Sequence, residues 1–188
     1  AAAFWLTAGV AGSKPVTCTG LNYECSAQGD RRIVDVLRKM GADIATAGNT
    51  VTARPSSLTA AQIDCADIPD LVPILAVAAS SAQGTTIFDN IRRLRIKESD
   101  RVQSILQLLG MAGIYAFASD NTLTVTGGPA KNCSYDPSGD HRMAMAAAVL
   151  ASSKDVKITI SDAECTAKSY PAFFDDFNAL GGIVLKQQ

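Results

Sequence analysis

The chain has 188 residues and a formal net charge of −1. Because 47% of its residues are hydrophobic, it is long enough and apolar enough to bury a core. This charge and the lack of long basic runs argue against a nucleic acid or a membrane surface as the main partner. No apolar stretch is long enough to cross a bilayer. A single histidine and cysteines without CxxC spacing predict no metal site, and we expect free thiols in a reducing cytoplasm at Cys18, Cys25, Cys65, Cys133 and Cys165.

The first seventy residues follow an alternating pattern of helix and strand signals. The chain begins without methionine inside an Ala-rich apolar stretch, which predicts a buried helix and an absent N-terminal half. A second helix is expected to end near Gly41, since glycine favours the position after a helix. The predicted order is helix 1–15, strand 16–19, helix from near Asp30, and a hairpin of strands 43–46 and 50–53.

The same order returns at shifts of about seventy residues. The second copy is predicted as helix 71–85, strand 85–88, a helix from near Asp100 to Gly113, and a hairpin of strands 114–117 and 123–126. The third is predicted as helix 141–155, strand 156–160, a helix from near Ser169 to Gly181, and one strand at 182–186. We therefore expect one α/β domain over residues 1–188, with pseudo-threefold repeats at about 1–70, 71–140 and 141–188, the third incomplete.

Basic residues stand near three of the predicted helix starts. Lys97 and Arg101 begin one helix, with Glu98 between them; Arg142 begins another; and Lys168 precedes Ser169, the expected N-cap of the last. Because a helix N-terminus carries about half a positive charge, a cation there is unfavourable by roughly 0.3–1 kcal/mol unless an anion lies beside it. The pattern therefore predicts a small bound anion.

Three motifs carry a resemblance to a known family: LRIKESDR at 94–101, GDHRMAM at 139–145 and CTAKSYP at 165–171, with weaker support from Ile68-Pro69-Asp70 and Gln28-Gly29-Asp30. They closely resemble the 5-enolpyruvylshikimate-3-phosphate synthases, which transfer the carboxyvinyl group of phosphoenolpyruvate to shikimate 3-phosphate without a cofactor or a metal. The resemblance implies the C-terminal lobe of a two-lobed fold built from βαβαββ units, an inside-out α/β barrel. It also implies that the missing N-terminal lobe is a partner, supplies a strand to the unfinished third unit, and is required for activity.

The resemblance also assigns roles to individual residues. Arg101, Arg142 and Lys168 would bind the carboxylate and phosphate of phosphoenolpyruvate. Asp70 would hold and deprotonate the substrate 5-hydroxyl, and Glu98 would handle the proton at the methylene carbon. Lys97 would contact shikimate 3-phosphate or the reacting centre. Two further substrate-binding candidates are Arg93, where some relatives place an uncharged residue, and His141.

Structural interpretations of several of these residues stay open on spacing alone. Asp70 and Asp140 each precede a predicted helix and can act as N-caps, and Asp140 is interpreted as structural. Glu98 and Arg101 are three residues apart, which also fits a surface ion pair worth about 0.2–0.5 kcal/mol. His141 fits a buried structural histidine, and Cys165 is not expected to be a nucleophile because no histidine is near it in sequence.

Three other functions compete with the transferase. The related transferase acting on UDP-N-acetylglucosamine shares the architecture, but the motifs around Lys97 and Arg142 disfavour it. A non-catalytic RNA- or anion-binding module of the same fold is a second alternative, disfavoured by the net negative charge and 6% aromatic content. An inactive structural fragment is the third.

Overall fold

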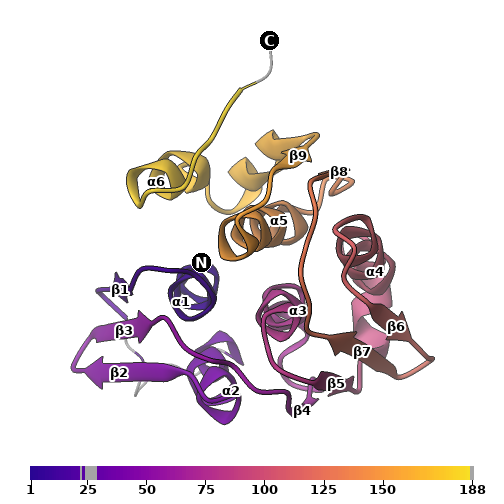
Figure 1. Cartoon of the computed structure of the whole chain (residues 1–188), viewed down its shortest axis with the longest axis horizontal. Helices are drawn as coiled ribbons and strands as arrows, with labels where there is room; N and C mark the ends of the chain where they lie inside the picture. Colours follow the sequence, from indigo (N-terminus) through magenta and orange to yellow (C-terminus); the bar gives the residue numbers. More distant parts are fainter. Residues whose placement is uncertain (22, 24–28, 187–188) are drawn as a thin grey trace.

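The computed structural model describes residues 1–21, 23 and 29–186. Three helices lie side by side near the centre of the molecule and contact one another pairwise, as Figure 1 shows. They are α1 (Ala2–Ala11), α3 (Val72–Ser80) and α5 (His141–Lys154). Each coincides with an Ala-rich stretch predicted as a buried helix. Small side chains allow this close packing, and every residue of α3 is buried.

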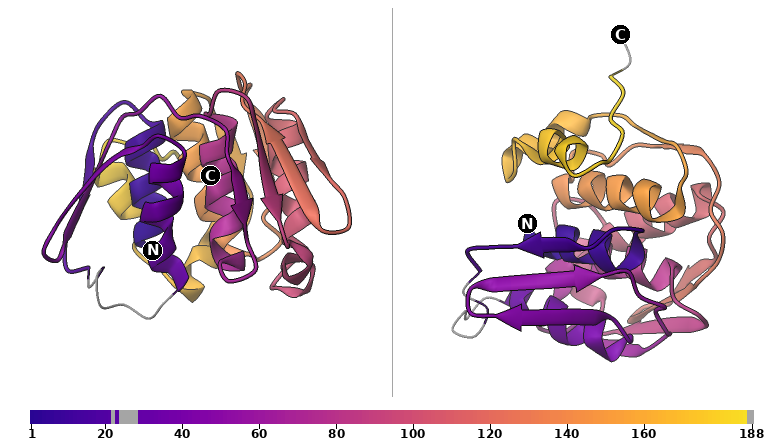
Figure 2. Two further views of the ribbon diagram at one scale, coloured as in Figure 1. Left: turned by 90° about the horizontal axis from the view of Figure 1, so that it is seen from below. Right: turned by 60° about the vertical axis from the view of Figure 1, so that its left-hand side comes forward.

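Three further helices and, within the described residues, three small sheets surround the central helices. The outer helices are α2 (Ile33–Lys39), α4 (Arg101–Met111) and α6 (Phe173–Ala179). The strands are β1 (Val16–Cys18), β2 (Asp43–Ala47), β3 (Thr50–Arg54), β4 (Gln62–Asp64), β5 (Thr85–Asp89), β6 (Ala116–Ala118), β7 (Thr122–Thr126), β8 (Cys133–Tyr135) and β9 (Ile158–Ile160). They form sheets with the strand orders β1-β3-β2, β4-β5-β7-β6 and β8-β9. Figure 2 shows the sheet β1-β3-β2 along one side of the molecule.

Both predicted hairpins are confirmed. β2 pairs antiparallel with β3, and β6 pairs antiparallel with β7. In β3 and β7 buried residues alternate with more exposed ones, so one face of each strand lies against the helices. Glycines with positive φ follow the outer helices at Gly41, Gly113 and Gly181, which confirms the predicted helix ends.

Two strands were not expected from the sequence. β4 pairs in parallel with β5, and β8 pairs in parallel with β9. Each has three residues, with a polar residue at the centre or at both ends, so neither gives a clear periodic signal. Together they extend the second sheet to four strands and give the third sheet its second strand.

The third segment departs from the prediction in three ways. The predicted strand at 182–186 is absent from the described residues, where Ile183 and Leu185 are 84% and 77% exposed and have no neighbouring strand. The last helix begins at Phe173 rather than near Ser169, which instead follows the 3-10 helix Ala163–Lys168. Ala172 occupies the N-cap position of α6 without a side-chain hydrogen bond, so the expected Ser169 cap is wrong.

The second predicted helix also starts later than expected. Residues Gly29–Arg32 form a 3-10 helix, and the α-helix begins at Ile33 rather than near Asp30. Cys18, Cys65, Cys133 and Cys165 carry free thiols, whereas Cys25 lies outside the described residues. Among the described residues, no helix is both long and apolar enough to span a membrane.

Aromatic side chains join the last helix to the first. Trp5 stacks on Phe173 with the ring centroids 5.0 Å apart, and Phe4 meets Phe173 edge to face. The Trp5 Nε1 atom donates to the Tyr170 hydroxyl at 3.3 Å. The start of α6 is therefore packed against α1.

We predict that Gly9→Ala lowers the free energy of unfolding by about 1–3 kcal/mol, because it overfills the contact between α1 and the first sheet. A Cβ atom at Gly9 would lie 2.9 Å from the carbonyl oxygen of Ala53 and 3.1 Å from Val16 Cβ. Urea denaturation measures the change. The control is Gly110→Ala in α4, where a Cβ meets nothing within 4 Å and should stabilise the helix by about 0.5–1 kcal/mol. Equal effects of the two substitutions would contradict the predicted close approach.

Candidate active site

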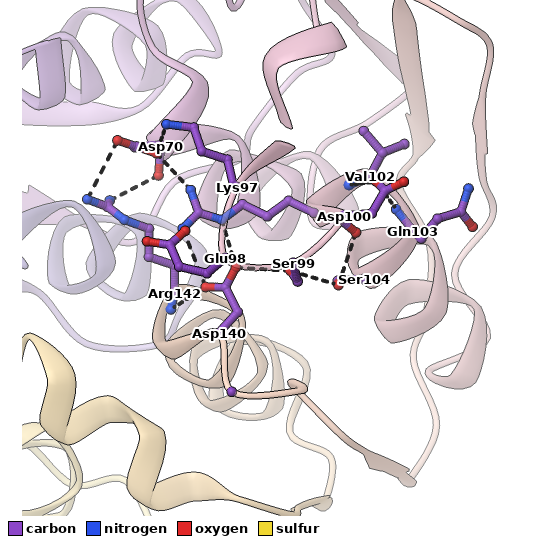
Figure 3. Close-up of polar contacts among 12 residues, drawn as sticks. Asp70, Lys97, Glu98, Ser99, Asp100, Val102, Gln103, Ser104, Asp140 and Arg142 are labelled. Atoms are coloured by element: carbon purple, nitrogen blue, oxygen red, sulfur yellow. Dashed lines mark hydrogen bonds and ion pairs between the residues drawn. The ribbon is translucent and has the colours of Figure 1, made fainter. Parts of the chain in front are cut away.

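The candidate residues come from four segments that lie far apart in the sequence. Asp70 is in the 3-10 helix Pro69–Leu71 that leads into α3, and Lys97 to Arg101 lead into α4. Asp140 and Arg142 begin α5, and Lys168 ends the 3-10 helix Ala163–Lys168. Figure 3 shows the side chains of Asp70, Lys97, Glu98, Asp140 and Arg142 converging on one place.

Arg101 is the centre of this cluster and is fully buried. Its Nε donates to Asp140 Oδ2 at 2.8 Å, its Nη1 donates to Asp70 Oδ1 at 2.7 Å, and its Nη2 donates to Glu98 Oε2. Burial alone would lower the pKa of Arg101, but the hydrogen bond and charge of Asp140, followed by Glu98 and Asp70, outweigh it and raise the pKa. The guanidinium is therefore charged and surrounded by three carboxylates.

Asp70 bridges three cations. Besides Arg101, its carboxylate lies 3.1 Å from Lys97 Nζ and 4.0 Å from Arg142 Nη2. Burial alone would raise the pKa of Asp70, but the hydrogen bond from Lys97, the charge of Arg142 and the hydrogen bond from Arg101 outweigh it, so the pKa lies below its usual value. The alternative that Asp70 caps the following helix is wrong, because Leu71 holds the N-cap position of α3 without a side-chain hydrogen bond.

Arg142 lies on the first turn of α5 and connects this helix to the 3-10 helices that precede α2 and α3. Its Nη1 donates to the backbone oxygen of Asp70 at 3.1 Å and lies 3.6 Å from Asp30 Oδ2. The sequence did not single out Asp30 as a site residue, although it belongs to the weak Gln28-Gly29-Asp30 motif. Gln28 lies outside the described residues.

Lys168 reaches the same turn from the other side. Its Nζ donates to the backbone oxygen of Gly139 at 2.8 Å, directly before Asp140, and its side chain is exposed. Gly139 has a φ of +74°, which a residue with a Cβ atom rarely adopts. Lys168 ends a 3-10 helix rather than preceding the first turn of α6, so the predicted placement at a helix start is wrong. Its contact with Gly139 instead places it at the turn that leads into α5.

Asp140 is fully buried and is the N-cap of α5, as predicted. Its Oδ1 accepts from the Arg142 backbone N–H at 3.0 Å, and its Oδ2 accepts from Ser99 Oγ at 3.1 Å. Ser104 Oγ in turn donates to Ser99 Oγ at 3.2 Å. Burial alone would raise the pKa of Asp140, but the hydrogen bond and charge of Arg101 and the hydrogen bond from Ser99 hold it below its usual value.

Ser99 precedes the N-cap residue of α4 and bonds to Asp140 instead of capping the helix. The sequence suggests that its hydroxyl can cap α4, but Asp100 is the cap and accepts from the backbone N–H groups of Val102 and Gln103. The hydrogen bond from Ser99 to Asp140 could not be predicted from the sequence, because it joins residues 41 positions apart. The local sequence shows only a hydroxyl residue directly before the capping aspartate.

The remaining candidates are less tightly connected to the cluster. His141 is partly buried, and its Nδ1 has no hydrogen-bond partner among the described residues. Burial lowers the pKa of His141; the charge of Asp140 opposes this shift, and the charge of Arg142 adds to it. Arg93 is exposed, and its Nη1 donates to the backbone oxygen of Ala66 at 3.4 Å. Burial raises the pKa of the Cys165 thiol to about 11, which disfavours the reactive thiolate.

The structure corrects the argument for a bound anion. Arg101 and Arg142 are already paired with carboxylates of the chain itself, so the helix-end charges alone do not require an external anion. Asp70 and Glu98 are 37% and 46% exposed, whereas the Arg101 side chain that they contact is fully buried. In the described part of the chain, no group of three or more His, Cys, Asp or Glu residues is arranged to hold a metal ion.

Comparisons with known proteins agree with the motifs. The family model for EPSP synthase (3-phosphoshikimate 1-carboxyvinyltransferase) matches residues 1–177. A 3-phosphoshikimate 1-carboxyvinyltransferase from Clostridium kluyveri is 43% identical over 96% of this chain and 42% of its own length. Another from Pyrococcus abyssi is 38% identical over 93% of this chain and 42% of its own length. The chain therefore spans less than half the length of these relatives.

Solved structures show the same fold. EPSP synthase from Acinetobacter baumannii superposes with a TM-score of 0.87 at 23% identity, covering 100% of this chain and 46% of that one. The enolpyruvyl transferase NikO from Streptomyces tendae superposes with a TM-score of 0.72 at 22% identity, covering 97% of this chain and 42% of that one. From the family model and the two sequence relatives together, this chain belongs to the EPSP synthase family.

Proposed function

We propose that this chain forms one wall of the active site of an enzyme that transfers the carboxyvinyl group of phosphoenolpyruvate to the 5-hydroxyl of shikimate 3-phosphate, with release of phosphate. The observation that carries the proposal is the gathering of Arg101, Arg142 and Lys168 around Asp70 and the 139–140 turn. The names of the sequence relatives support this activity over transfer to UDP-N-acetylglucosamine.

In this proposal the cations bind phosphoenolpyruvate. A guanidinium presents parallel N–H donors that match a carboxylate or phosphate, and two such groups with a lysine can neutralise a multiply charged anion. The Nη atoms of Arg101 now face Asp70 and Glu98, so binding is an exchange in which ligand oxygens replace these carboxylates. Arg142 and the exposed Lys168 complete the anion site.

The same exchange prepares the acid–base groups. Asp70 has a lowered pKa because Lys97, Arg142 and Arg101 stabilise its charged form. When phosphoenolpyruvate occupies those cations, Asp70 loses part of this stabilisation, its pKa rises, and it becomes a stronger base toward the 5-hydroxyl. Glu98, released from Arg101, is then free to transfer the proton at the methylene carbon, while Lys97 stabilises negative charge at the reacting centre.

The proposal includes a second wall from the rest of the protein. The relatives are more than twice as long as the matched region, and the cluster lies partly exposed at the surface of this chain. We therefore expect that the N-terminal lobe is the partner, that it supplies the other contacts to shikimate 3-phosphate, and that this chain is inactive without it.

Reconstitution tests the proposed function. The chain, combined with the part of the Clostridium kluyveri relative that it does not match, should release phosphate from phosphoenolpyruvate only when shikimate 3-phosphate is present. The chain alone should release none. A folded, associated pair that releases no phosphate, or that turns over UDP-N-acetylglucosamine instead, would refute the assignment.

Loss of one ligand cation should weaken phosphoenolpyruvate binding. Arg142→Ala and Lys168→Ala should each raise the KM for phosphoenolpyruvate at least about fivefold in the reconstituted enzyme, because each removes a charge-assisted contact. Arg92→Ala is the control, since Arg92 makes an exposed ion pair with Asp120. An unchanged KM in either test variant would remove that residue from the site.

Asp70→Asn should separate binding from chemistry. General-base loss predicts a fall in kcat of about 10²–10⁴-fold. The affinity for phosphoenolpyruvate should not fall, because the substitution removes the negative charge that now competes for the same cations. Steady-state kinetics measures kcat, and isothermal titration measures affinity. A variant with weakened binding and normal kcat would contradict both roles.

A further inference from the structure

We propose that Asp140 is a positioning residue for the anion site, holding Arg101 by its Nε edge while capping the helix that carries Arg142, with Ser99 fixing the orientation of its carboxylate. The inference rests on the proposed function, which supplies the ligand. It goes beyond the interpretation of Asp140 as a helix cap, because capping uses one oxygen and this carboxylate uses both.

The two oxygens of Asp140 serve two different cation-bearing segments. Oδ2 accepts from Arg101 Nε at 2.8 Å and from Ser99 Oγ at 3.1 Å. Oδ1 accepts from the backbone N–H of Arg142 at 3.0 Å and, at the longer distance of 3.5 Å, from Arg101 Nη2. One rigid, fully buried carboxylate therefore fixes the start of α4 relative to the start of α5.

The contacts of Arg101 divide by their accessibility. The Nε atom donates to Asp140, which is fully buried, and Nη2 makes a second, longer contact with Asp140 Oδ1 at 3.5 Å. The shorter contacts of the Nη atoms are with Asp70 and Glu98, which are partly exposed. Exchange at the Nη atoms can therefore proceed while the Nε contact persists and keeps the guanidinium plane in one orientation.

The third cation is held by the same turn. Lys168 Nζ donates to the backbone oxygen of Gly139, the residue directly before Asp140. A shift of the turn would move Arg101, Arg142 and Lys168 together. A buried ion pair is weak evidence for stability, since desolvation offsets much of the attraction, but it fixes geometry well when every lone pair is used.

Asp140→Asn, Ser99→Ala and Asp100→Asn test the proposal. Asparagine at 140 keeps an oxygen for the cap and loses the charge opposite Arg101. Asp100→Asn is the matched control, because Asp100 also caps a helix but makes its ion pair with Arg95 at 3.5 Å. Ser99→Ala is a milder variant that removes one hydrogen bond to Asp140.

The first readout is the Arg101 Nε–H signal in NMR spectra of the 188-residue chain, and the second is the KM for phosphoenolpyruvate in the reconstituted enzyme. Asp140→Asn should speed Nε–H exchange and raise the KM, each about tenfold, with a smaller fall in kcat. Ser99→Ala should raise the Nε–H exchange rate and the KM about two- to threefold, and Asp100→Asn should change neither the exchange rate nor the KM. Thermal unfolding of each variant checks that the variant is folded at the temperature of the NMR and kinetic measurements.

Two outcomes overturn the positioning role while leaving the proposed function intact: an Nε–H signal unchanged by Asp140→Asn, or a KM equal to that of Asp100→Asn. An inactive wild-type pair refutes the proposed function instead. In that event inorganic phosphate, titrated into the chain alone, replaces KM as the readout. Asp140→Asn must then weaken the phosphate-induced shifts of Arg142 and Lys168 at least fivefold, and equal shifts overturn the inference.

Discussion

A buried guanidinium surrounded by three carboxylates is the interaction on which the arrangement of this protein depends. Arg101 has no exposed surface, and its partners come from before α3, before α4 and before α5. Asp140 is fully buried with Arg101, whereas Asp70 and Glu98 are partly exposed, so the contact with Asp140 is the one that lies wholly in the interior. The segments that carry Asp70, Glu98 and Asp140 are therefore held to one geometry around Arg101.

The central helices bring these segments to one end of the fold. α1, α3 and α5 pack against one another through small side chains (Figure 1), so the turns that precede α3 and α5 lie close enough for Arg142 to reach Asp70. At the opposite end of α3, Lys154 of α5 donates to the backbone oxygen of Ser80, where a cation is favourable near a helix C-terminus. The scaffold is thus fixed at both ends of the helix pair, and the cation cluster is presented on a stable base.

Much of the fold follows from local sequence rules, and the site only in part. Ala-rich stretches, glycines such as Gly113 and turn residues around Gly48 mark the central helices, the helix ends and the hairpins because these signals act over a few residues. Three-residue strands such as Gln62–Asp64 are too short to show periodicity. The pairing of Arg101 with Asp140 spans 39 residues and depends on tertiary packing. The motifs therefore identified the cations, and the i,i+3 spacing correctly allowed the ion pair between Glu98 and Arg101. The pairing of Arg101 with Asp70 and Asp140, and the bridging role of Ser99, were not predicted.

In the proposed function, ligand oxygens replace Asp70 and Glu98 at the Nη atoms of Arg101, while Asp140 continues to hold its Nε atom. A crystal structure of the reconstituted enzyme with phosphoenolpyruvate bound tests this most directly. We predict that the contact from Arg101 Nε to Asp140 Oδ2 remains near 2.8 Å while ligand oxygens replace Asp70 and Glu98 at the Nη atoms. A bound ligand with Arg101 detached from Asp140, or with Asp70 and Glu98 still on its Nη atoms, would contradict the account.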